Sequence, residues 1–354
     1  MQIPILILAA MNGVSKRLLL LVLLCAFVFF LTAQEKFRVM FYNVENLYDT
    51  KDNPATNDDE FTPGGQLHWT NYRYWQKLHN ISKAVSSVGE GYPPAIVGLC
   101  EVENDSVLYH LTKRTALQKD KYEYVITRSK DLRGSNVALL YQRDQIKILS
   151  RKSYTPDLGD SVRSTRDILH VTGKVVNGTL LDVFVCHFPS RREGIRKTRP
   201  HRIKCAQLLK HKVDSVLHLR KGANVIIMGD FNDYPNDISM SEVLGGKRIE
   251  SDISTKGLYN LLYDRIDKKG AGSYKYKGKW GFIDQIVVNG NLLEKGGKVF
   301  VKDKTVHVFS AEFLLEADNK KYGGQKPFRT YSGFKYLGGY SDHLPIYMDL
   351  LISP

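Results

Sequence analysis

Cysteine is scarce in this 354-residue chain, and its four cysteines are scattered. Cys25 lies in an apolar run near the N-terminus, while Cys100 and Cys186 end short apolar segments. No C-x-x-C spacing is present, so the sequence predicts neither a thiolate metal site nor a fold defined by disulfides. We expect Cys100 and Cys186 to pack as small buried hydrophobic residues.

Long hydrophobic runs are also few, and the one near the N-terminus is short. Lys16 and Arg17 precede an apolar run from Leu18 to Leu31, and small residues follow it. This order is typical of a secretory signal, and the run is too short for a comfortable bilayer span. We predict that residues 1–33 are a signal peptide, that the protein is periplasmic or extracellular, and that no stable membrane insertion remains after cleavage. An uncleaved N-terminal anchor is the alternative.

Acidic residues are outnumbered by basic ones. The chain has 51 Lys and Arg against 37 Asp and Glu, which gives a formal net charge of +14. Such a chain is attracted to polyanions such as nucleic acid, anionic lipid or phosphorylated sugars. Charge alone does not choose a partner, because scattered lysines also keep proteins soluble.

The chain has no internal repeat and no low-complexity linker, so we predict one α/β domain over residues 34–354. Short runs rich in Val, Ile, Leu and aromatic residues predict strands. The predicted strands are Phe37–Tyr42, Ala95–Cys100, Tyr122–Thr127, Ala138–Tyr141, Leu180–Cys186, Val225–Met228, Ile283–Val288 and Leu344–Asp349.

Two stretches have apolar residues at helical spacing. They predict helices over Arg73–Ser87 and roughly Arg199–Arg220, with Pro200 in the first turn of the second helix. The segments Asp49–Tyr72 and Lys302–Tyr340 are rich in Gly, Asn, Lys and aromatic residues. Long loops in compact domains are usually functional or disordered, and we expect the second segment to overhang the site as a specificity loop.

Polar side chains follow the apolar strands at the points where the strands end. A single carboxylate after a strand is usually a turn former or a helix cap, but six such coincidences are harder to dismiss. Binding groups in open α/β sheets gather at strand ends, so we expect these residues to converge. The six strand ends carry Asn43, Glu101, His187, Asp230 with Asn232, Asp284, and Asp342 with His343.

The chemistry of this set is that of hard oxygen ligands, two histidines and two amides, without a thiol. Such a set suits Mg²⁺ or Mn²⁺ together with phosphate. Hydrolysis of a phosphodiester needs a cation on a non-bridging oxygen, a base that activates water and a group that stabilises the leaving oxygen. The set can supply all three, and it predicts a metal-dependent phosphoesterase.

An ordered series of motifs over residues 37–350 resembles the endonuclease/exonuclease/phosphatase family. In chain order the motifs are YNVEN, LCEVEN, GSNVALLY, TRDIL, CHFPSRREG, GDFND, FIDQIVV and YSDHLP. GDFND and SDHLP are individually specific. The resemblance implies a two-sheet α/β sandwich of four layers, with helices outside two packed mixed sheets and the site at one rim.

The resemblance also implies residues that bind the metal and the substrate. Glu101 matches the metal ligand of the family, and Asp342 is a second acid of the metal site. Asn43 supports the metal and phosphate region. Arg166 matches a phosphate-contacting arginine by its local context.

The remaining residues take catalytic roles by the same resemblance. Asp230 positions or deprotonates the attacking water, and Asn232 orients the phosphate and transition state. Asp284 pairs with His343, which fixes the tautomer of the imidazole and raises its basicity. His187 protonates the leaving oxygen or binds phosphate. Whether Asp230 or His343 is the base stays open.

Branch-specific positions narrow the function. The inositol phosphatase branch carries Trp-Cys-Asp-Arg where this chain has Phe282-Ile283-Asp284-Gln285, and abasic-site enzymes usually have a tyrosine in place of His187. We therefore predict an exported, monomeric nuclease that uses Mg²⁺ or Mn²⁺ to hydrolyse nucleic acid or another phosphodiester. The alternatives are a sphingomyelinase-like or small-molecule phosphoesterase and a non-catalytic polyanion-binding protein.

A basic segment directly follows His187. It either grips a substrate backbone or forms a solvated approach to a helix, because Arg pairs well with phosphate but is also a common surface residue. Its basic residues are Arg191, Arg192, Arg196, Lys197, Arg199, His201 and Arg202.

Overall fold

The computed structural model describes residues 35–159, 164–266, 268, 270–318 and 322–353. The predicted signal peptide, residues 1–33, lies outside this part of the chain. Within the described residues, no helix has both the length and the apolar character needed to cross a bilayer.

The first large sheet has seven strands and contains both ends of the described chain. Its strands follow the order β14-β20-β1-β2-β4-β3, and β15 also pairs with β20. β1 and β2 are parallel, whereas β20 and β4 run antiparallel to their neighbours. The bounds are β1 (Glu35–Leu47), β2 (Ile96–Val102), β3 (Tyr122–Ile126), β4 (Asn136–Gln142), β14 (Val299–Val301), β15 (His307–Val308) and β20 (Ile346–Ile352).

The second large sheet is built from the middle of the chain. Its seven strands follow the order β5-β6-β7-β8-β13-β10-β9, and β7 runs parallel to β8. β13 lies antiparallel on the other side of β8. The bounds are β5 (Ile146–Tyr154), β6 (Ile168–Val175), β7 (Leu180–His187), β8 (Val225–Asp230), β9 (Gly246–Lys247), β10 (Leu258–Asn260) and β13 (Asp284–Asn289).

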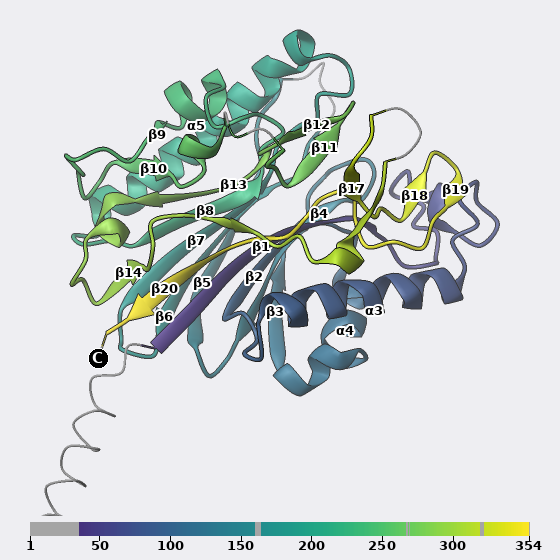
Figure 1. The fold of residues 1–354 in the computed structure, drawn as a ribbon, viewed down its shortest axis with the longest axis horizontal. Coiled ribbons are helices and arrows are strands. Elements are labelled where there is room, and N and C mark those ends of the chain that lie inside the picture. The colour runs from purple at the N-terminus through teal and green to yellow at the C-terminus, as the bar shows by residue number, and fades with distance from the viewer. Residues whose placement is uncertain (1–34, 160–163, 267, 269, 319–321, 354) are drawn as a thin grey trace, which may run out of the picture.

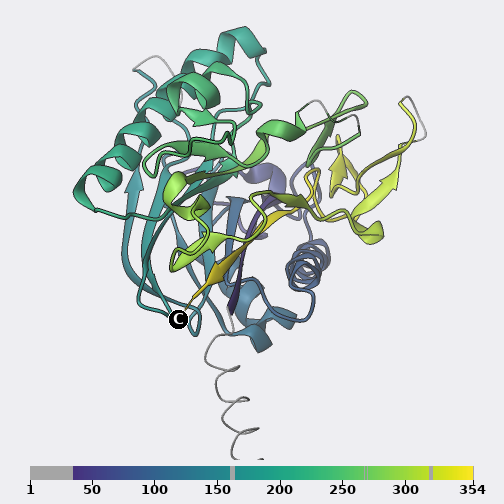
Figure 2. The same ribbon diagram turned by 60° about the vertical axis from the view of Figure 1, so that its left-hand side comes forward.

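Among the described residues, three α-helices cover the outer faces of the two sheets, which gives the predicted four layers (Figures 1 and 2). α3 (Asn71–Val88) and α4 (Asp105–Lys113) pack on the first sheet, and α5 (Ile195–Leu219) packs on the second. Single turns of other helix types connect the elements. They are η1 (Asp59–Phe61), η2 (Ala116–Asp120), η3 (Ser239–Val243), η4 (Tyr263–Arg265), η5 (Gly290–Leu293) and η6 (Glu312–Leu314).

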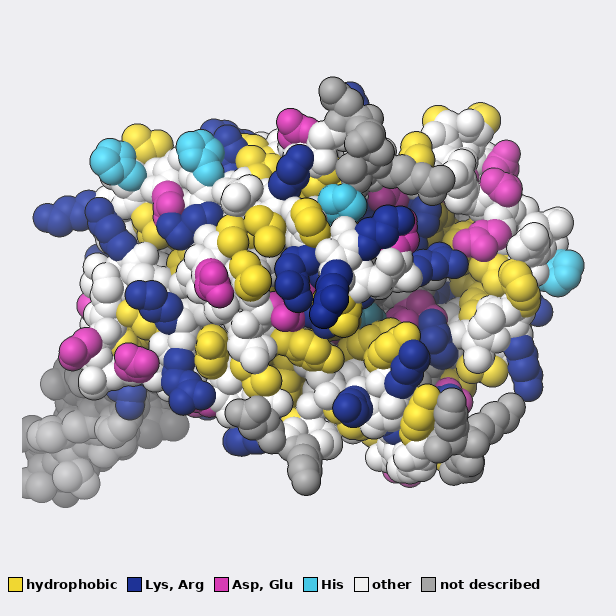
Figure 3. Space-filling model, turned by 90° about the horizontal axis from the view of Figure 1, so that it is seen from above, with side chains coloured by type: hydrophobic (Ala, Val, Ile, Leu, Met, Phe, Trp, Pro, Cys, Tyr) yellow, Lys and Arg dark blue, Asp and Glu magenta, His cyan; other side chains and the backbone are white. Residues whose placement is uncertain are grey.

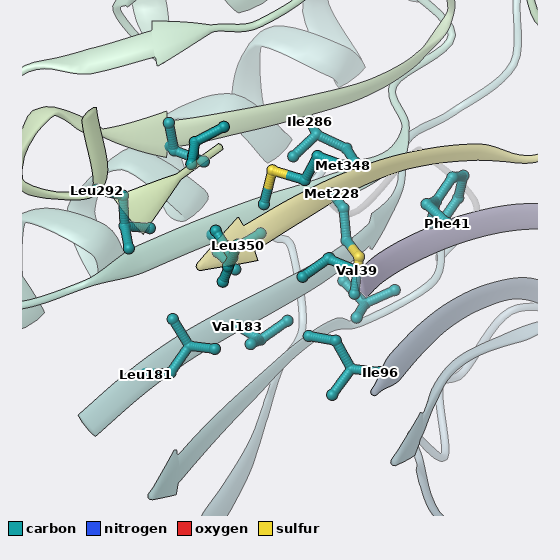
Figure 4. Close-up of a cluster of buried hydrophobic side chains, with 14 of the residues drawn as sticks. Val39, Phe41, Ile96, Leu181, Val183, Met228, Ile286, Leu292, Met348 and Leu350 are labelled. Carbon is teal, nitrogen blue, oxygen red and sulfur yellow. The ribbon is translucent and has the colours of Figure 1, made fainter. Parts of the chain in front are cut away.

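The main core lies between the two sheets. Successive side chains of a strand point to opposite faces, so Val39 and Phe41 of β1 face the second sheet while Met40 and Tyr42 face the helices. Figure 4 shows this inner layer, where Val183, Met228 and Ile286 of the second sheet meet Val39, Ile96 and Met348 of the first. The sequence prediction of a two-sheet sandwich is confirmed by this arrangement.

Some local predictions differ from the structure. The second predicted helix begins at Ile195, not near Arg199, so Pro200 lies in its second turn. Proline there leaves one carbonyl of the preceding turn without its helical donor. β5 and β6 were not predicted as strands, and β5 is a mostly exposed edge strand without the apolar run of a buried one.

The segment predicted as a long loop over residues 302–340 carries two short hairpins. A third hairpin lies in the segment before β13, and all three stand at the same end of the molecule, on the right of Figure 1. The hairpins are β11–β12 (Tyr274–Tyr276 and Lys279–Gly281), β16–β17 (Leu315–Ala317 and Gln325–Pro327) and β18–β19 (Tyr331–Ser332 and Lys335–Tyr336).

The packing between the sheets can be tested at Leu350 of β20, which is fully buried in the main core. We expect Leu350→Ala to lower the free energy of unfolding by about 2–5 kcal/mol, through lost apolar burial and the cavity left behind. Leu219→Ala is the matched control, because Leu219 is 83% exposed at the end of α5. Chemical denaturation of both variants checks the expectation, and equal stabilities would contradict it.

Candidate active site

The predicted site residues of both sheets come together at one rim of the sandwich. Asn43 and Glu101 lie near the ends of the neighbouring parallel strands β1 and β2. His187 ends β7 and Asp230 ends β8, while Asp284 begins β13. The register places Asp230 opposite His187 on one side and opposite Asp284 on the other. The second sheet therefore supplies three adjacent functional side chains from one row.

The Asn43 amide joins the two sheets at the centre of the site. Its Nδ2 lies 3.2 Å from Glu101 Oε1 and 3.1 Å from Asp230 Oδ2, and 3.5 Å from His343 Nε2. Its Oδ1 accepts a hydrogen bond from the backbone N–H of Glu45 at 3.0 Å. One buried amide thus sets the spacing between an acid of the first sheet and an acid of the second.

Glu101 is held as an ionised carboxylate. Its Oε2 accepts the backbone N–H of Asn46 at 3.0 Å. Burial by itself raises the pKa of Glu101, but the charges of Arg133 and His343 and the hydrogen bond from Asn43 outweigh burial and leave the pKa below its usual range. An ionised carboxylate with a partly exposed side chain is suited to bind a divalent cation.

Asp284 and His343 form a buried carboxylate–histidine pair, as predicted. His343 Nδ1 lies 2.7 Å from Asp284 Oδ2, which also accepts the hydroxyl of Ser273 at 2.5 Å. The imidazole packs against the ring of Tyr274, with 4.6 Å between ring centroids. The Nδ1 contact leaves Nε2 to face the site, 3.9 Å from Asp230 Oδ2.

This pairing fixes the protonation of His343. Burial alone lowers the pKa of an imidazole, but the charge of Asp284 and its hydrogen bond, together with the charges of Asp342 and Asp230, raise the pKa of His343 to about 10. His343 is therefore an imidazolium at neutral pH, and both of its ring nitrogens are donors.

The pKa of the Asp230 carboxylate is also raised. Burial and the nearby charge of Asp284 raise its pKa to about 7, although the positive His343 opposes them. Its Oδ1 accepts the backbone N–H of Asn232 at 2.9 Å. A carboxylate whose pKa lies near neutrality is suited to general acid–base chemistry.

His187 lies beside both central carboxylates. Its Nε2 is 3.9 Å from Glu101 Oε1 and 3.7 Å from Asp230 Oδ2. Burial and the positive charge of Arg166 hold its pKa well below the usual value, so the ring is neutral. Its buried Nδ1 has no hydrogen-bond partner among the described residues. Among the described residues, acids therefore approach His187 at Nε2 and not at Nδ1.

Asn232 and Arg166 meet at one backbone carbonyl. Asn232 Nδ2 donates to Phe188 O at 3.0 Å, and Arg166 NH2 donates to the same oxygen at 2.8 Å. Arg166 NH1 also lies 3.4 Å from Asp131 Oδ2. The two predicted substrate contacts thus stand next to His187, which directly precedes Phe188.

Asp342 lies beside the site but is engaged by an arginine. Its Oδ2 accepts Arg329 NH2 at 3.0 Å, while its Oδ1 lies 3.9 Å from His343 Nε2. The same guanidinium binds Glu45 through Nε at 3.1 Å. Arg329, Glu45 and the hydrogen bond from Ser273 to Asp284 were not predicted. Glu45 lies within the YNVEN motif, but its partner Arg329 is 284 residues away and lies in no motif.

Four residues of the site have left-handed backbone conformations without being glycine. The φ angles are +49° at Glu45, +54° at Asn46, +62° at Glu101 and +51° at Asn232. Such conformations cost on the order of 1–3 kcal/mol each and cluster at functional sites. The backbone is therefore shaped to aim these side chains at the centre of the rim.

The donor set fits a divalent cation. One ligand atom each from Asp230, Asp284 and His343 lies within 4.8 Å of the others, and all three residues are buried. Asp284 Oδ2 is engaged by His343 and Ser273, whereas its buried Oδ1 has no hydrogen-bond partner among the described residues. The ionised Glu101 carboxylate lies beside this group, where the Asn43 amide joins it to Asp230. Oxygen donors without thiolates match the preference of Mg²⁺ and Mn²⁺.

Several basic side chains of the segment after His187 form ion pairs within the protein. Arg191 NH2 lies 2.8 Å from Asp233 Oδ1, and the buried Arg202 Nε lies 2.8 Å from the same oxygen. Lys197 pairs with Glu193 at 2.6 Å on the surface of α5. Arg202 therefore anchors α5, and Arg191 the segment before it, to the loop after β8, while Arg192 lines the cavity beside the site.

Comparison with known proteins agrees with this geometry. The sequence profile described as Endonuclease/Exonuclease/phosphatase family matches residues 38–351. The crystal structure of an endonuclease/exonuclease/phosphatase family protein from Bacteroides thetaiotaomicron is similar, with a TM-score of 0.55, 16% identity and coverage of 91% of this chain and 99% of that one. Among proteins with curated descriptions, no match is found.

Two further solved structures share the fold. D. rerio TDP2 in complex with a single-strand DNA product has a TM-score of 0.52 and 17% identity, and the alignment covers 89% of this chain and 99% of that one. A mannosyl-6-phosphatase from Bacteroides thetaiotaomicron has a TM-score of 0.53 and 16% identity, with the same two coverages. At these identities the likeness concerns the fold alone.

Proposed function

Because this chain belongs to the endonuclease/exonuclease/phosphatase family, whose members are metal-dependent phosphoester hydrolases, we propose that it is a nuclease that hydrolyses phosphodiester bonds in nucleic acid. The observation that carries this proposal is the buried Asn43 amide, which holds Glu101 beside Asp230 and opposite the Asp284–His343 pair. Residues 1–33 direct its export in this proposal.

Glu101 would hold Mg²⁺ or Mn²⁺ in the proposed enzyme, beside Asp230. The bound ion would neutralise charge on a non-bridging phosphate oxygen and favour ionisation of water. Asn43 fixes the distance between the two carboxylates through its side-chain amide. Asp342 is turned toward Arg329, so we assign it to the surroundings of His343 and not to the metal.

The proposed proton transfers follow from the raised pKa values of Asp230 and His343. Asp230, with a pKa near neutrality, is suited to accept a proton from the attacking water. His343 is an imidazolium that points Nε2–H at the site, so we assign it to stabilising the charge of the phosphoryl group and assign the base to Asp230. His187 is neutral and hydrogen-bonds the phosphate or the leaving oxygen.

Several features favour nucleic acid over other phosphodiesters. The chain is basic overall, and in Figure 3 Lys and Arg side chains gather near the middle of the face seen, beside acidic side chains. Electrostatic attraction to phosphates supplies most non-specific binding to nucleic acid. A protein with this fold, D. rerio TDP2, has been solved in complex with a single-strand DNA product.

Hydrolysis assays with the purified protein test the proposal. Plasmid DNA, RNA, sphingomyelin and bis-p-nitrophenyl phosphate are each offered with Mg²⁺, with Mn²⁺ and with EDTA. We expect DNA or RNA to be cleaved with either metal, and activity to fall to background in EDTA and to return when metal is added. Cleavage of sphingomyelin alone, or activity that survives EDTA, would refute the nuclease assignment.

A further inference from the structure

A cavity of about 530 Å³ opens beside the active site, between the 49–72 and 302–340 segments. It reaches the site through Asn46, whose backbone N–H holds Glu101 at 3.0 Å. We propose that this cavity receives one unpaired nucleobase next to the scissile phosphate, so that the enzyme cuts single strands in preference to duplexes. This inference rests on the proposed nuclease function and goes beyond it.

The floor of the cavity is a rigid aromatic stack that joins the two segments. The rings of Tyr48 and Phe61 stack with 4.4 Å between centroids, and Trp69 Nε1 donates to Tyr48 O at 3.0 Å. Tyr331 of β18 packs on Trp69 at 5.9 Å, and its hydroxyl donates to Leu67 O at 2.9 Å. The cavity is therefore built before a ligand enters, which lowers the entropic cost of binding.

Phe334 stands at the turn between β18 and β19 and lines the cavity without being part of that stack. Its side chain is 68% exposed, whereas Tyr331 of the same hairpin, which also lines the cavity, is 8% exposed. An accessible aromatic face beside a phosphate-cleaving site is suited to stack on a base of an unpaired strand.

The charges that line the cavity select a neutral ligand. Arg192 and Arg329 are balanced by Glu45 and Glu60, so the cavity as a whole offers no excess positive charge for a second phosphate. These four charged side chains also make the wall unsuitable for an acyl chain, because burying charges against hydrocarbon is costly.

The remaining polar side chains suit the edge of a base. Asn46 and Gln66 both line the cavity, and each carboxamide carries a donor and an acceptor. Bases of single strands are recognised by stacking together with hydrogen bonds to their Watson–Crick edges. A base in a duplex is stacked on both faces and paired along this edge, so it must leave the helix before it can enter, which costs free energy.

The test compares Phe334→Ala with the native protein on three substrates: a single-stranded oligodeoxynucleotide, the duplex of the same sequence and bis-p-nitrophenyl phosphate. Tyr92→Ala is the matched control, because Tyr92 is 82% exposed before β2, at the opposite end of that strand from Glu101. We expect the native enzyme to prefer the single strand. Phe334→Ala should lose about ten- to a hundredfold in kcat/KM on that strand, the range for one base stacked on an aromatic ring.

The loss should be selective. We expect the loss on bis-p-nitrophenyl phosphate, which carries no base, to be at least tenfold smaller, and Phe334→Tyr to restore most of the lost activity. Equal losses on both substrates, or native cleavage of duplex and single strand at equal rates, would overturn the base pocket while leaving the nuclease assignment standing. Hydrolysis of bis-p-nitrophenyl phosphate without cleavage of any nucleic acid would overturn both proposals.

Discussion

Replacing Asp230 by asparagine is expected to lower kcat by about 10²–10⁴-fold, the range for loss of a general base. The amide has nearly the shape of the carboxylate but cannot accept the proton of the attacking water. Metal affinity should fall as well, because Asp230 shares the Asn43 amide with Glu101. Steady-state kinetics at several Mg²⁺ concentrations separate the two effects. A higher Mg²⁺ concentration compensates for weaker metal binding but does not restore the activity lost with the base.

The same substitution has an expected signature in stability. Burial and Asp284 raise the pKa of Asp230 to about 7, whereas an unfolded aspartate titrates near 3.9. The folded state therefore binds the proton more tightly, and the charged carboxylate destabilises the fold above neutral pH. In EDTA at pH 8, Asp230→Asn should unfold at a higher temperature than the native protein, and this gain should disappear as the pH falls toward 4.

Asp214→Asn is the matched control for both readouts. Asp214 lies on the exposed face of α5, where its carboxylate pairs with Lys210. Exposed pairs of this kind contribute little to stability, so activity and melting temperature should stay near native values. Retention of native activity by Asp230→Asn would remove Asp230 from the catalytic machinery.

Breaking the Asp284–His343 pair is the second change with a large expected effect. We expect Asp284→Asn and His343→Gln each to lower kcat by about 10²–10⁴-fold, and the double variant to be no worse than the poorer single one. Non-additivity follows because the two residues act as one unit, in which Asp284 keeps His343 charged. A double-mutant cycle of kcat on one substrate measures the coupling between Asp284 and His343 directly.

Titration of the imidazole tests the reason for the effect. The charge of Asp284 is the largest influence that raises the pKa of His343 to about 10. Its removal in Asp284→Asn should move the His343 titration, followed by NMR, to a lower pH. Asp303→Asn is the control, since Asp303 and His307 form a similar pair at 2.8 Å with both side chains 42% exposed. Independent, additive losses in the first pair would contradict a shared role.

The strand ends were the most predictable part of the site. The apolar runs before Asn43, Glu101 and Asp230 predict strands, and parallel neighbours necessarily carry their last residues to the same edge. Asp284 reaches that edge because β13 runs antiparallel to β8 and begins where β8 ends. Pattern and topology together therefore place these residues, although no single one of them is informative alone.

The parts that were missed depend on contacts between distant irregular segments. Arg329 binds Glu45 and Asp342 from a loop whose sequence shows only that it is basic and aromatic. The left-handed backbone of Glu101 is equally invisible, because nothing in the residue type calls for a positive φ. Arg191 was counted as a candidate for gripping substrate, but its partner Asp233 lies 42 residues away and becomes its neighbour only in the folded chain.

The order of strands in the first sheet also governs how the enzyme must fold. β20 lies between β1 and β14, and the pair Arg38–Asp349 that joins β1 to β20 is separated by 311 residues, with the whole second sheet between them in sequence. Contacts of such long range raise the contact order and slow folding, because a large loop must close before they form. His343 lies three residues before β20, so the Asn43–His343 geometry arises only when this long-range pairing is made, and the refolding chain should not become active before it forms.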